Sequence, residues 1–416
     1  MQTTVQSSFK GLGLSEALLH DLNKAGFQEP TPIQAQAIPP GLAGRDVLGC
    51  AQTGTGKTAA FVIPMIERLA GTTDSHPRGL ILAPTRELAI QIQDTVAKLG
   101  RSRRVYATTL VGGADMNAQL RGLRQRPDIL VATPGRLLDH MWNGTVNLIK
   151  MQILVLDEAD RMLDMGFAPQ INQILEALPE ERQTLLFSAT LPTDVADLAR
   201  ASVKDPVRVT IGRSAAPAER AAQALHHTSR EDKTKLLLTL LDADRDSVLV
   251  FTRTKHGADR LGRAVGNAGH KVAIIHGNRS LSQRRAALEG FRRGTFRVLV
   301  ATDIAARGID VANIGHVVNY DLPSTPEDYI HRIGRTARVK ASGRATSFVT
   351  ADDHLQLRAI EKLLGQAIPR AVGSAPPHPV QPVHNQRHNG QRDTRPGRPS
   401  GFRPRQPAHA RRSHGT

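Results

Sequence analysis

The stretch "DVLGCAQTGTGKTAAF" (Asp46 to Phe61) decides the fold of this chain. A short apolar run leads into a loop of glycine and threonine, and the last letters suit a helix. This order predicts a buried strand, a tight turn and a helix in succession. The same alternation recurs at "GLILA" (79–83), "DILVA" (128–132), "QILVL" (152–156) and "TLLFS" (184–188). Short aliphatic runs separated by helices are typical of parallel strands, so we predict an α/β fold with parallel sheets and helices on both faces.

The alternation stops once and then restarts. After Val209 the sequence loosens into "TIGRSAAPAERAAQ" (210–223), and new apolar runs follow at "SVLVF" (247–251), "KVAII" (271–275), "RVLVA" (297–301), "HVVNY" (316–320) and "ATSFV" (345–349). We therefore predict two tandem α/β domains, 1–209 and 221–368, joined by a linker at 210–220.

A different composition begins near Pro369. Residues 373–416 contain eight Arg, one Asp and a single aromatic side chain, Phe402. Such a segment cannot bury enough apolar surface to fold, so we predict a disordered Arg/Pro/His-rich tail at 369–416. It is either a solubilising tail or an electrostatic tether for nucleic acid, and its positive sign favours the tether.

The charge balance bounds the class of partner. The 416 residues carry a formal net charge of +17, which favours nucleic acid over an acidic small substrate. No run of about 18 apolar residues predicts a membrane span, and no signal peptide is visible at the start. The single cysteine, Cys50, cannot form an internal disulfide. We expect a cytoplasmic protein that does not contact membranes.

The glycine-rich loop predicts a phosphate site. Gly54 and Gly56 let backbone N–H groups converge on a phosphate at a helix N-terminus. Lys57 would reach the β- and γ-phosphates, and the Thr58 hydroxyl would bind Mg²⁺. Ala51 stands where the general pattern has its first glycine. The alternative is a Gly/Thr turn that only caps a helix.

Three carboxylates follow a buried strand in "ILVLDEADRMLDMGF" (Ile153 to Phe167). Asp157, Glu158 and Asp160 would suit a helix N-terminus or a solvated turn. The carboxyl ends of parallel strands share one edge, however, so these residues should lie beside the Lys57 loop. We predict that Asp157 holds Mg²⁺, that Glu158 orients or deprotonates the attacking water, and that Asp160 links to another motif. The chain would then be a nucleotide hydrolase.

Further motifs occur in a fixed order. They are "GFQEPTPIQ" (26–34), "AQTGTGKT" (51–58), "PTRELA" (84–89), Gly112-Gly113, "TPGR" (133–136), "DEAD" (157–160), "SAT" (188–190), "FTRT" (251–254), "ATDIAARGID" (301–310) and "HRIGRTAR" (331–338). This ordered set, over roughly residues 9–365, resembles the DEAD-box ATP-dependent RNA helicases of superfamily 2. The spelling "VFTRTKHGADRL" (250–261) and the short core resemble the bacterial RhlE-like branch of that family.

The resemblance implies two RecA-like domains with ATP between them and RNA across both. It implies that Phe9 stacks on adenine, that Gln34 reads the adenine edge and that Asp310 binds the ribose. The remaining implied ATP contacts are Ala51, Gln52, Thr53, Gly54, Thr55, Gly56, Lys57 and Thr58. Implied coupling residues between ATP and RNA are Asp160, Ser188, Thr190 and His331.

The resemblance also assigns arginine fingers to the second domain. "YIHRIGRTAR" (329–338) has the pattern of one helix, on which His331, Arg335 and Arg338 share a face. A solvated basic face is the ordinary explanation of such a stripe. By analogy with the family, Arg335 and Arg338 complete a catalytic set with Lys57, Asp157 and Glu158.

Implied RNA contacts use chemistry that suits phosphates rather than bases. These residues are Thr85, Arg86, Gly112, Gly113, Thr133, Gly135, Arg136, Arg253, Thr302 and Arg307. We therefore expect an ATP-dependent RNA helicase with a monomeric core that unwinds short duplexes or remodels RNA–protein complexes. The alternatives are an ATP-gated RNA clamp or chaperone with little unwinding, and a DNA-acting helicase. The chain departs from the family pattern at Leu281, where Gln is usual, and at Ala337, where Gly is usual.

Overall fold

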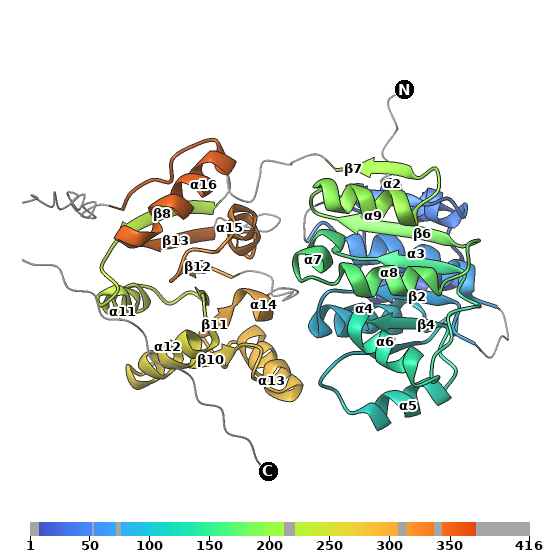
Figure 1. The fold of residues 1–416 in the computed structure, drawn as a ribbon, viewed down its shortest axis with the longest axis horizontal. Coiled ribbons are helices and arrows are strands. Elements are labelled where there is room, and N and C mark those ends of the chain that lie inside the picture. The colour runs from blue at the N-terminus through green and yellow to red at the C-terminus, as the bar shows by residue number, and fades with distance from the viewer. Residues whose placement is uncertain are drawn as a thin grey trace, which may run out of the picture. The chain divides into compact units, whose positions relative to one another are not determined.

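The computed structural model describes residues 8–51, 54–71, 76–211, 221–306, 314–336 and 343–371. Residues 372–416 of the predicted tail and most of the predicted linker lie outside this part of the chain. Two separate parallel sheets form the described structure (Figure 1).

The first sheet has the strand order β3-β4-β2-β5-β6-β1-β7, and every neighbouring pair is parallel. Its strands are β1 (Val47–Cys50), β2 (Gly79–Leu82), β3 (Ala107–Leu110), β4 (Ile129–Ala132), β5 (Ile153–Leu156), β6 (Gln183–Ser188) and β7 (Val207–Thr210). The five apolar runs predicted for this domain form the five central strands, where both faces of a strand are covered.

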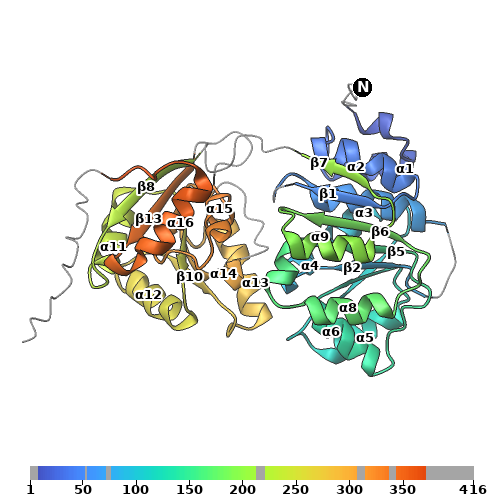
Figure 2. The same cartoon turned by 45° about the horizontal axis from the view of Figure 1, so that its top comes forward.

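Helices cover both faces of the first sheet because successive strand residues point to opposite sides (Figure 2). Val47 packs with η1 (Phe9–Leu12), α1 (Glu16–Lys24), α2 (Pro32–Leu42), α3 (Lys57–Leu69) and α4 (Arg86–Leu99). Its neighbour Leu48 lies in the other core, with α6 (Pro134–Trp142), α7 (Ala159–Asp164), α8 (Ala168–Glu176) and α9 (Thr193–Ser202). α5 (Met116–Arg124) lies beside β3.

The second sheet has the order β10-β11-β9-β12-β13-β8 and is also parallel throughout. Its strands are β8 (Ala221–His227), β9 (Val248–Thr252), β10 (Val272–Ile275), β11 (Val298–Thr302), β12 (His316–Asn319) and β13 (Gly343–Val349). Val248 and Val250 pack with α11 (Lys233–Ala243) and α12 (Lys255–Asn267). The other face carries α13 (Leu281–Arg292), α14 (Asp303–Ala306), α15 (Pro326–Ile333) and α16 (His354–Leu364), and η2 (Ala351–Asp353) precedes α16.

The predicted fold class is therefore confirmed: two parallel sheets, each with helices on both faces. In the first sheet Cys50 pairs with Ser188, so the loop after β1 and the segment after β6 leave the sheet side by side. β5 lies on the other side of β6 and delivers Asp157 to the same edge. No helix within the described ranges is long and apolar enough to cross a bilayer.

Candidate nucleotide and RNA site

The glycine-rich loop has the backbone that a phosphate cradle requires. Gly54 and Gly56 have φ values of 88° and 94°, in the region that favours glycine, and α3 begins at Lys57. Lys57 is 6% exposed, and its Nζ donates to the Ala51 carbonyl at 2.9 Å. The Ala51 carbonyl, at the first position of the pattern, thus accepts from the Lys57 ammonium group. Gln52 and Thr53 lie outside the described residues.

Gln34 joins α2 to this loop. Its Nε2 donates to the Gly56 carbonyl at 3.0 Å, while its Oε1 accepts from the Thr31 N–H at 2.9 Å within the capping box of α2. A Cβ added at Gly56 would lie 2.4 Å from the Gln34 amide nitrogen, so only glycine allows this approach. Reading of the adenine edge by Gln34 stays a prediction.

Phe9 lies in the first core, edge-on to Phe27 with the ring centroids 6.3 Å apart. Only 4% of the residue is exposed. This is the packing role that an isolated phenylalanine would have, and stacking of Phe9 on adenine stays a prediction.

The chain turns sharply after β5, between the two carboxylates that were predicted to be catalytic. The Asp157 N–H donates to the Leu82 carbonyl at 3.0 Å and continues the ladder, whereas Glu158 has φ 50° and ψ 52°, in the left-handed region. Burial raises the pKa of Asp157 to about 7; the charge of Lys57 opposes this rise, and the charge of Glu158 adds to it.

The pKa of Glu158 shifts in the opposite direction to that of Asp157. Burial disfavours its charge, but Arg161, Lys57 and Arg335 outweigh burial and lower the pKa of Glu158 to about 2. Arg161 Nη1 donates to Glu158 Oε2, and both side chains are buried. The sequence analysis did not identify Arg161, although its spacing of three residues from Glu158 on a helix was the available signal.

The residues present fit a magnesium ion. Mg²⁺ usually takes one or two carboxylates, with water and substrate phosphates completing its shell. Among the described residues no group of three or more His, Cys, Asp or Glu side chains forms a metal cage. Asp157, a buried carboxylate, and the hydroxyl of Thr58 in the first turn of α3 are the oxygen donors that would hold the ion.

Asp160 connects the carboxylate segment to the end of β6. One of its oxygens, Oδ2, accepts from the Ala189 N–H at 3.1 Å, the Thr190 N–H at 3.0 Å and the Thr190 hydroxyl at 3.0 Å. The Asp160 N–H in turn donates to Ser188 Oγ at 3.3 Å. The structure therefore brings together three of the four residues predicted to couple ATP and RNA.

The prediction that "YIHRIGRTAR" (329–338) forms one helix, with His331 and Arg335 on the same face, is wrong. α15 ends at Ile333 with Gly334 as its C-cap, and the Arg335 N–H donates to the Arg332 carbonyl in a turn. Glycine is a usual helix terminator, and it ends the helix before either predicted finger. Arg335 is 4% exposed and lies close enough to lower the pKa of Glu158. Arg338 and Asp310 lie outside the described residues.

Two further side chains of this segment have different partners. His331 Nδ1 lies 4.0 Å from Asp328 Oδ1 on α15. Arg332, which the sequence analysis passed over, is buried and donates to both Asp303 oxygens at 2.6 and 2.7 Å. It also lies over the Phe251 ring, with its guanidinium carbon 4.8 Å from the ring centroid. Arg332 thus fixes α15 against the segment that follows β11.

A cavity of about 460 Å³ collects the RNA contacts predicted for the first domain. Thr85 and Thr133 are the N-caps of α4 and α6. A Cβ at Gly113, where φ is 70°, would lie 2.1 Å from Arg86 Nη1, so the glycine loop rests on this guanidinium. Six of the predicted contacts line the cavity, namely Thr85, Arg86, Gly112, Thr133, Gly135 and Arg136.

Gly277 and Arg284 line the same cavity. Arg284 Nη2 forms an ion pair with Glu87 Oε2 at 2.7 Å, and both side chains are buried. The sequence analysis did not predict Glu87. Leu281, at the position where the family usually has Gln, begins α13, and the Gln283 side chain accepts from the Ser280 N–H as part of the helix cap.

Arg253 and Thr302, the described RNA contacts predicted for the second domain, do not line this cavity. Arg253 lines a different cavity, and Thr302 lies at the end of β11 with 9% of its surface exposed. Arg307 lies outside the described residues. RNA binding by these residues stays a prediction.

Two family models match the chain, one in each domain. Residues 31–198 match the DEAD/DEAH box helicase model, and residues 232–340 match the helicase conserved C-terminal domain. The chain is 42% identical to the DEAD-box ATP-dependent RNA helicase CshA of Bacillus subtilis over 85% of its own length and 72% of the relative. It is 43% identical to the ATP-dependent RNA helicase CshA of Limosilactobacillus reuteri, over 85% and 71%.

Solved structures of the same class have the same fold. Dbp5 of S. cerevisiae bound to RNA and ADP BeF3 superposes with a TM-score of 0.78 at 34% identity, over 88% of this chain and 95% of that one. A DEAD box protein from Methanococcus jannaschii gives a TM-score of 0.52 at 36% identity, over 88% and 99%. The resemblance to the RhlE-like branch stays a prediction, because these relatives carry other names. On this evidence the chain belongs to the DEAD-box family of ATP-dependent RNA helicases.

Proposed function

We propose that the chain binds RNA through its phosphate backbone and uses ATP hydrolysis to unwind short duplexes or to remodel RNA–protein complexes. The observation that carries this proposal is the Asp160 network, because three hydrogen bonds on one carboxylate oxygen join the segment of Asp157 and Glu158 to Ala189 and Thr190. A change at the nucleotide can therefore be transmitted to the segment after β6.

The residues at the carboxyl edge divide the work of hydrolysis. Lys57 would exchange the Ala51 carbonyl for the β- and γ-phosphates of ATP. Thr58 and Asp157 would hold Mg²⁺, which supplies charge neutralisation for the phosphates. Glu158 stays ionised because its pKa is about 2, so it is suited to orient the attacking water rather than to hold its proton.

Arg335 is the residue that supplies positive charge from the second domain. Its influence on the pKa of Glu158 supports a position near the carboxylates, where an arginine stabilises the charge of phosphoryl transfer. Arg338, Asp310 and His331 retain the roles that the family resemblance implies.

RNA binding is expected to be independent of sequence. The cavity beside α4 and α6 offers hydroxyls, backbone N–H groups at glycines and the Arg86 and Arg136 guanidiniums. We further propose that Arg253, Thr302 and Arg307 contact RNA, that 369–416 acts as a tether, and that the core works as a monomer in the cytoplasm.

One paired assay tests this function. ATP turnover is measured with no nucleic acid, with RNA and with DNA, alongside unwinding of a short RNA duplex. Turnover that RNA stimulates, together with unwinding, supports the proposal. Stimulation without unwinding would replace it with an ATP-gated clamp, and equal stimulation by DNA would replace it with a DNA-acting helicase.

A further inference from the structure

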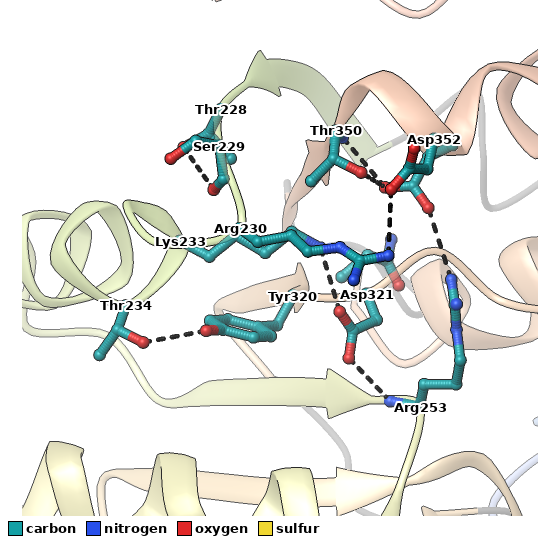
Figure 3. Close-up of polar contacts among 12 residues, drawn as sticks. Thr228, Ser229, Arg230, Lys233, Thr234, Arg253, Tyr320, Asp321, Thr350 and Asp352 are labelled. Atoms are coloured by element: carbon teal, nitrogen blue, oxygen red, sulfur yellow. Dashed lines mark hydrogen bonds and ion pairs between the residues drawn. The ribbon is translucent and has the colours of Figure 1, made fainter.

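A second cavity, of about 320 Å³, lies at the carboxyl edge of the second sheet (Figure 3). Its wall includes residues that follow four parallel strands: Arg230 after β8, Arg253 after β9, Tyr320 after β12 and Thr350 after β13. The first turns of α11 and α12 contribute Lys233 and Gly257. In open α/β sheets this edge is where ligands bind.

Both carboxylates in the wall are engaged by the protein itself. Asp321 Oδ1 pairs with Lys233 Nζ at 3.0 Å, and its Oδ2 accepts from the Arg253 N–H at 3.0 Å. Asp353 Oδ2 accepts from the Thr350 N–H at 3.0 Å and from its hydroxyl at 2.7 Å. Figure 3 shows the Asp321 side chain between Lys233 and Arg253, with dashed lines to both.

The cations outnumber the carboxylates, and the three arginines among them are exposed while Lys233 is buried. Arg230, Lys233, Arg253 and Arg260 line the cavity, against Asp321 and Asp353. The Arg253 side chain is half-exposed, with Nη2 3.4 Å from Asp353 Oδ1. Arg260 is exposed, and within the described ranges it has no hydrogen bond or ion pair, although its charge acts on the Tyr320 hydroxyl.

The partner of Arg230 is easily displaced. Its Nη2 lies 3.0 Å from Asp352 Oδ2, and the two side chains are 77% and 71% exposed. A pair this open to water contributes roughly 0–1 kcal/mol, so a dianion can compete for the guanidinium. Three arginines thus have donors available to a ligand in the cavity.

The start of α12 adds positive potential in the same direction. This helix is 13 residues long, and its N-cap Thr254 accepts from the Gly257 N–H at 3.0 Å. Thr254 and Gly257 both line the cavity, so the positive end of the helix dipole faces the same cavity as the arginines. Guanidiniums, hydroxyls and a helix N-terminus together are the donors that phosphate prefers.

We propose that this cavity binds a phosphate group, carried either by an RNA strand or by a phosphorylated small molecule. The site lies on the second domain alone and uses neither the Lys57 loop nor the cavity beside α4 and α6. In this proposal Arg253, one of the predicted RNA contacts, binds the anion together with Arg230 and Arg260.

The test compares Arg260→Gln with Arg263→Gln. Both arginines are exposed on α12, but Arg263 is not in the cavity wall, so it controls for the loss of one positive charge. Arg230→Gln, which breaks only an exposed pair, serves as a second variant of the cavity. Circular dichroism and thermal unfolding establish that each full-length variant is folded.

The first arm measures the binding of pyrophosphate to the full chain carrying Lys57→Ala, which weakens the phosphate site of the first domain. We expect Arg260→Gln to weaken pyrophosphate binding about threefold to tenfold, and Arg263→Gln to leave it unchanged. The second arm measures RNA affinity against salt, where each phosphate contact to a single strand contributes about 0.7 to the logarithmic slope.

The two arms separate the sources of the phosphate. A slope reduced by about 0.7 in Arg260→Gln but not in Arg263→Gln identifies RNA, whereas loss of pyrophosphate binding alone identifies a small molecule. The proposal is overturned when Arg260→Gln and Arg230→Gln change neither quantity, or when Arg263→Gln has the same effect. RNA-stimulated ATP turnover of the unmodified chain tests the helicase function separately.

Discussion

Replacement of Asp160 by asparagine should disconnect ATP hydrolysis from work on RNA. In the structure Oδ2 accepts three hydrogen bonds from Ala189 and Thr190, and Oδ1 accepts from the Arg161 N–H at 3.0 Å. An amide has one acceptor oxygen, so in either orientation its NH₂ group faces at least one donor, and the negative charge is lost.

The magnitude follows from these contacts. A hydrogen bond to a charged group contributes about 1.5–3 kcal/mol, and the variant loses the charge on three bonds and the acceptor of a fourth. Because water and rearrangement offset part of this loss, we expect about 3 kcal/mol, which corresponds to a factor on the order of 10².

The assay follows ATP turnover and duplex unwinding in the same reaction. In Asp160→Asn, the number of duplexes unwound per ATP hydrolysed should fall by a factor on the order of 10². ATP binding should persist because Lys57 is unchanged. Thr190→Val, which removes one of the three bonds, should show a smaller loss, and Thr193→Ala, at an exposed position of α9, should show none. Normal unwinding per ATP in Asp160→Asn would refute the coupling role.

Four other outcomes can be checked. Glu158→Gln should bind ATP and RNA but hydrolyse very slowly, and near-normal turnover in a phosphate-release assay would contradict its assignment. Arg335→Ala should bind ATP with little change and lose turnover by roughly 10³ or more, whereas unchanged turnover would exclude a finger role. Deletion of 373–416 should weaken RNA binding and flatten its salt dependence; an unaltered slope would favour the solubilising role. Burial lowers the pKa of His316 from 6.5 to about 4, so about 3 kcal/mol of stability, present above pH 6.5, should be lost as the pH falls towards 4. Denaturant unfolding of His316→Gln, which keeps a donor for Thr346, should lack this loss, and an equal loss would contradict it.

The sequence predicted the central strands and missed three of the four edge strands of the described sheets. β3 and β7 form the edges of the first sheet and β8 forms one edge of the second, whereas the opposite edge, β10, was predicted from its apolar run. β3 alternates between buried and half-buried residues, and β7 reads "VRVT", with Arg208 and Thr210 exposed. Continuous apolar runs arise only where helices cover both faces, so strands at an edge carry a weaker signal.

The site was predictable where a motif carries its own geometry. The glycines of the phosphate loop and the carboxylates after β5 lie where their local pattern placed them. The partners that tune them depend on the folded chain. Glu87 and Arg284 are far apart in sequence, and so are Arg332 on α15 and its partner Asp303 at the start of α14.

The bonding of Lys57 and Gln34 has a consequence for nucleotide selectivity. Each side chain already has a carbonyl acceptor within the chain, at Ala51 and at Gly56. A nucleotide that binds here must offer these two donors stronger acceptors than the peptide oxygens that they already contact. Its affinity therefore reflects the exchange of two hydrogen bonds rather than the gain of two new ones. Under the roles predicted for these residues, discrimination among nucleobases would take place at the Gln34 exchange and binding of the triphosphate at the Lys57 exchange. Base recognition and phosphate retention would then be set by separate exchanges, one at a side chain of α2 and the other at the first residue of α3.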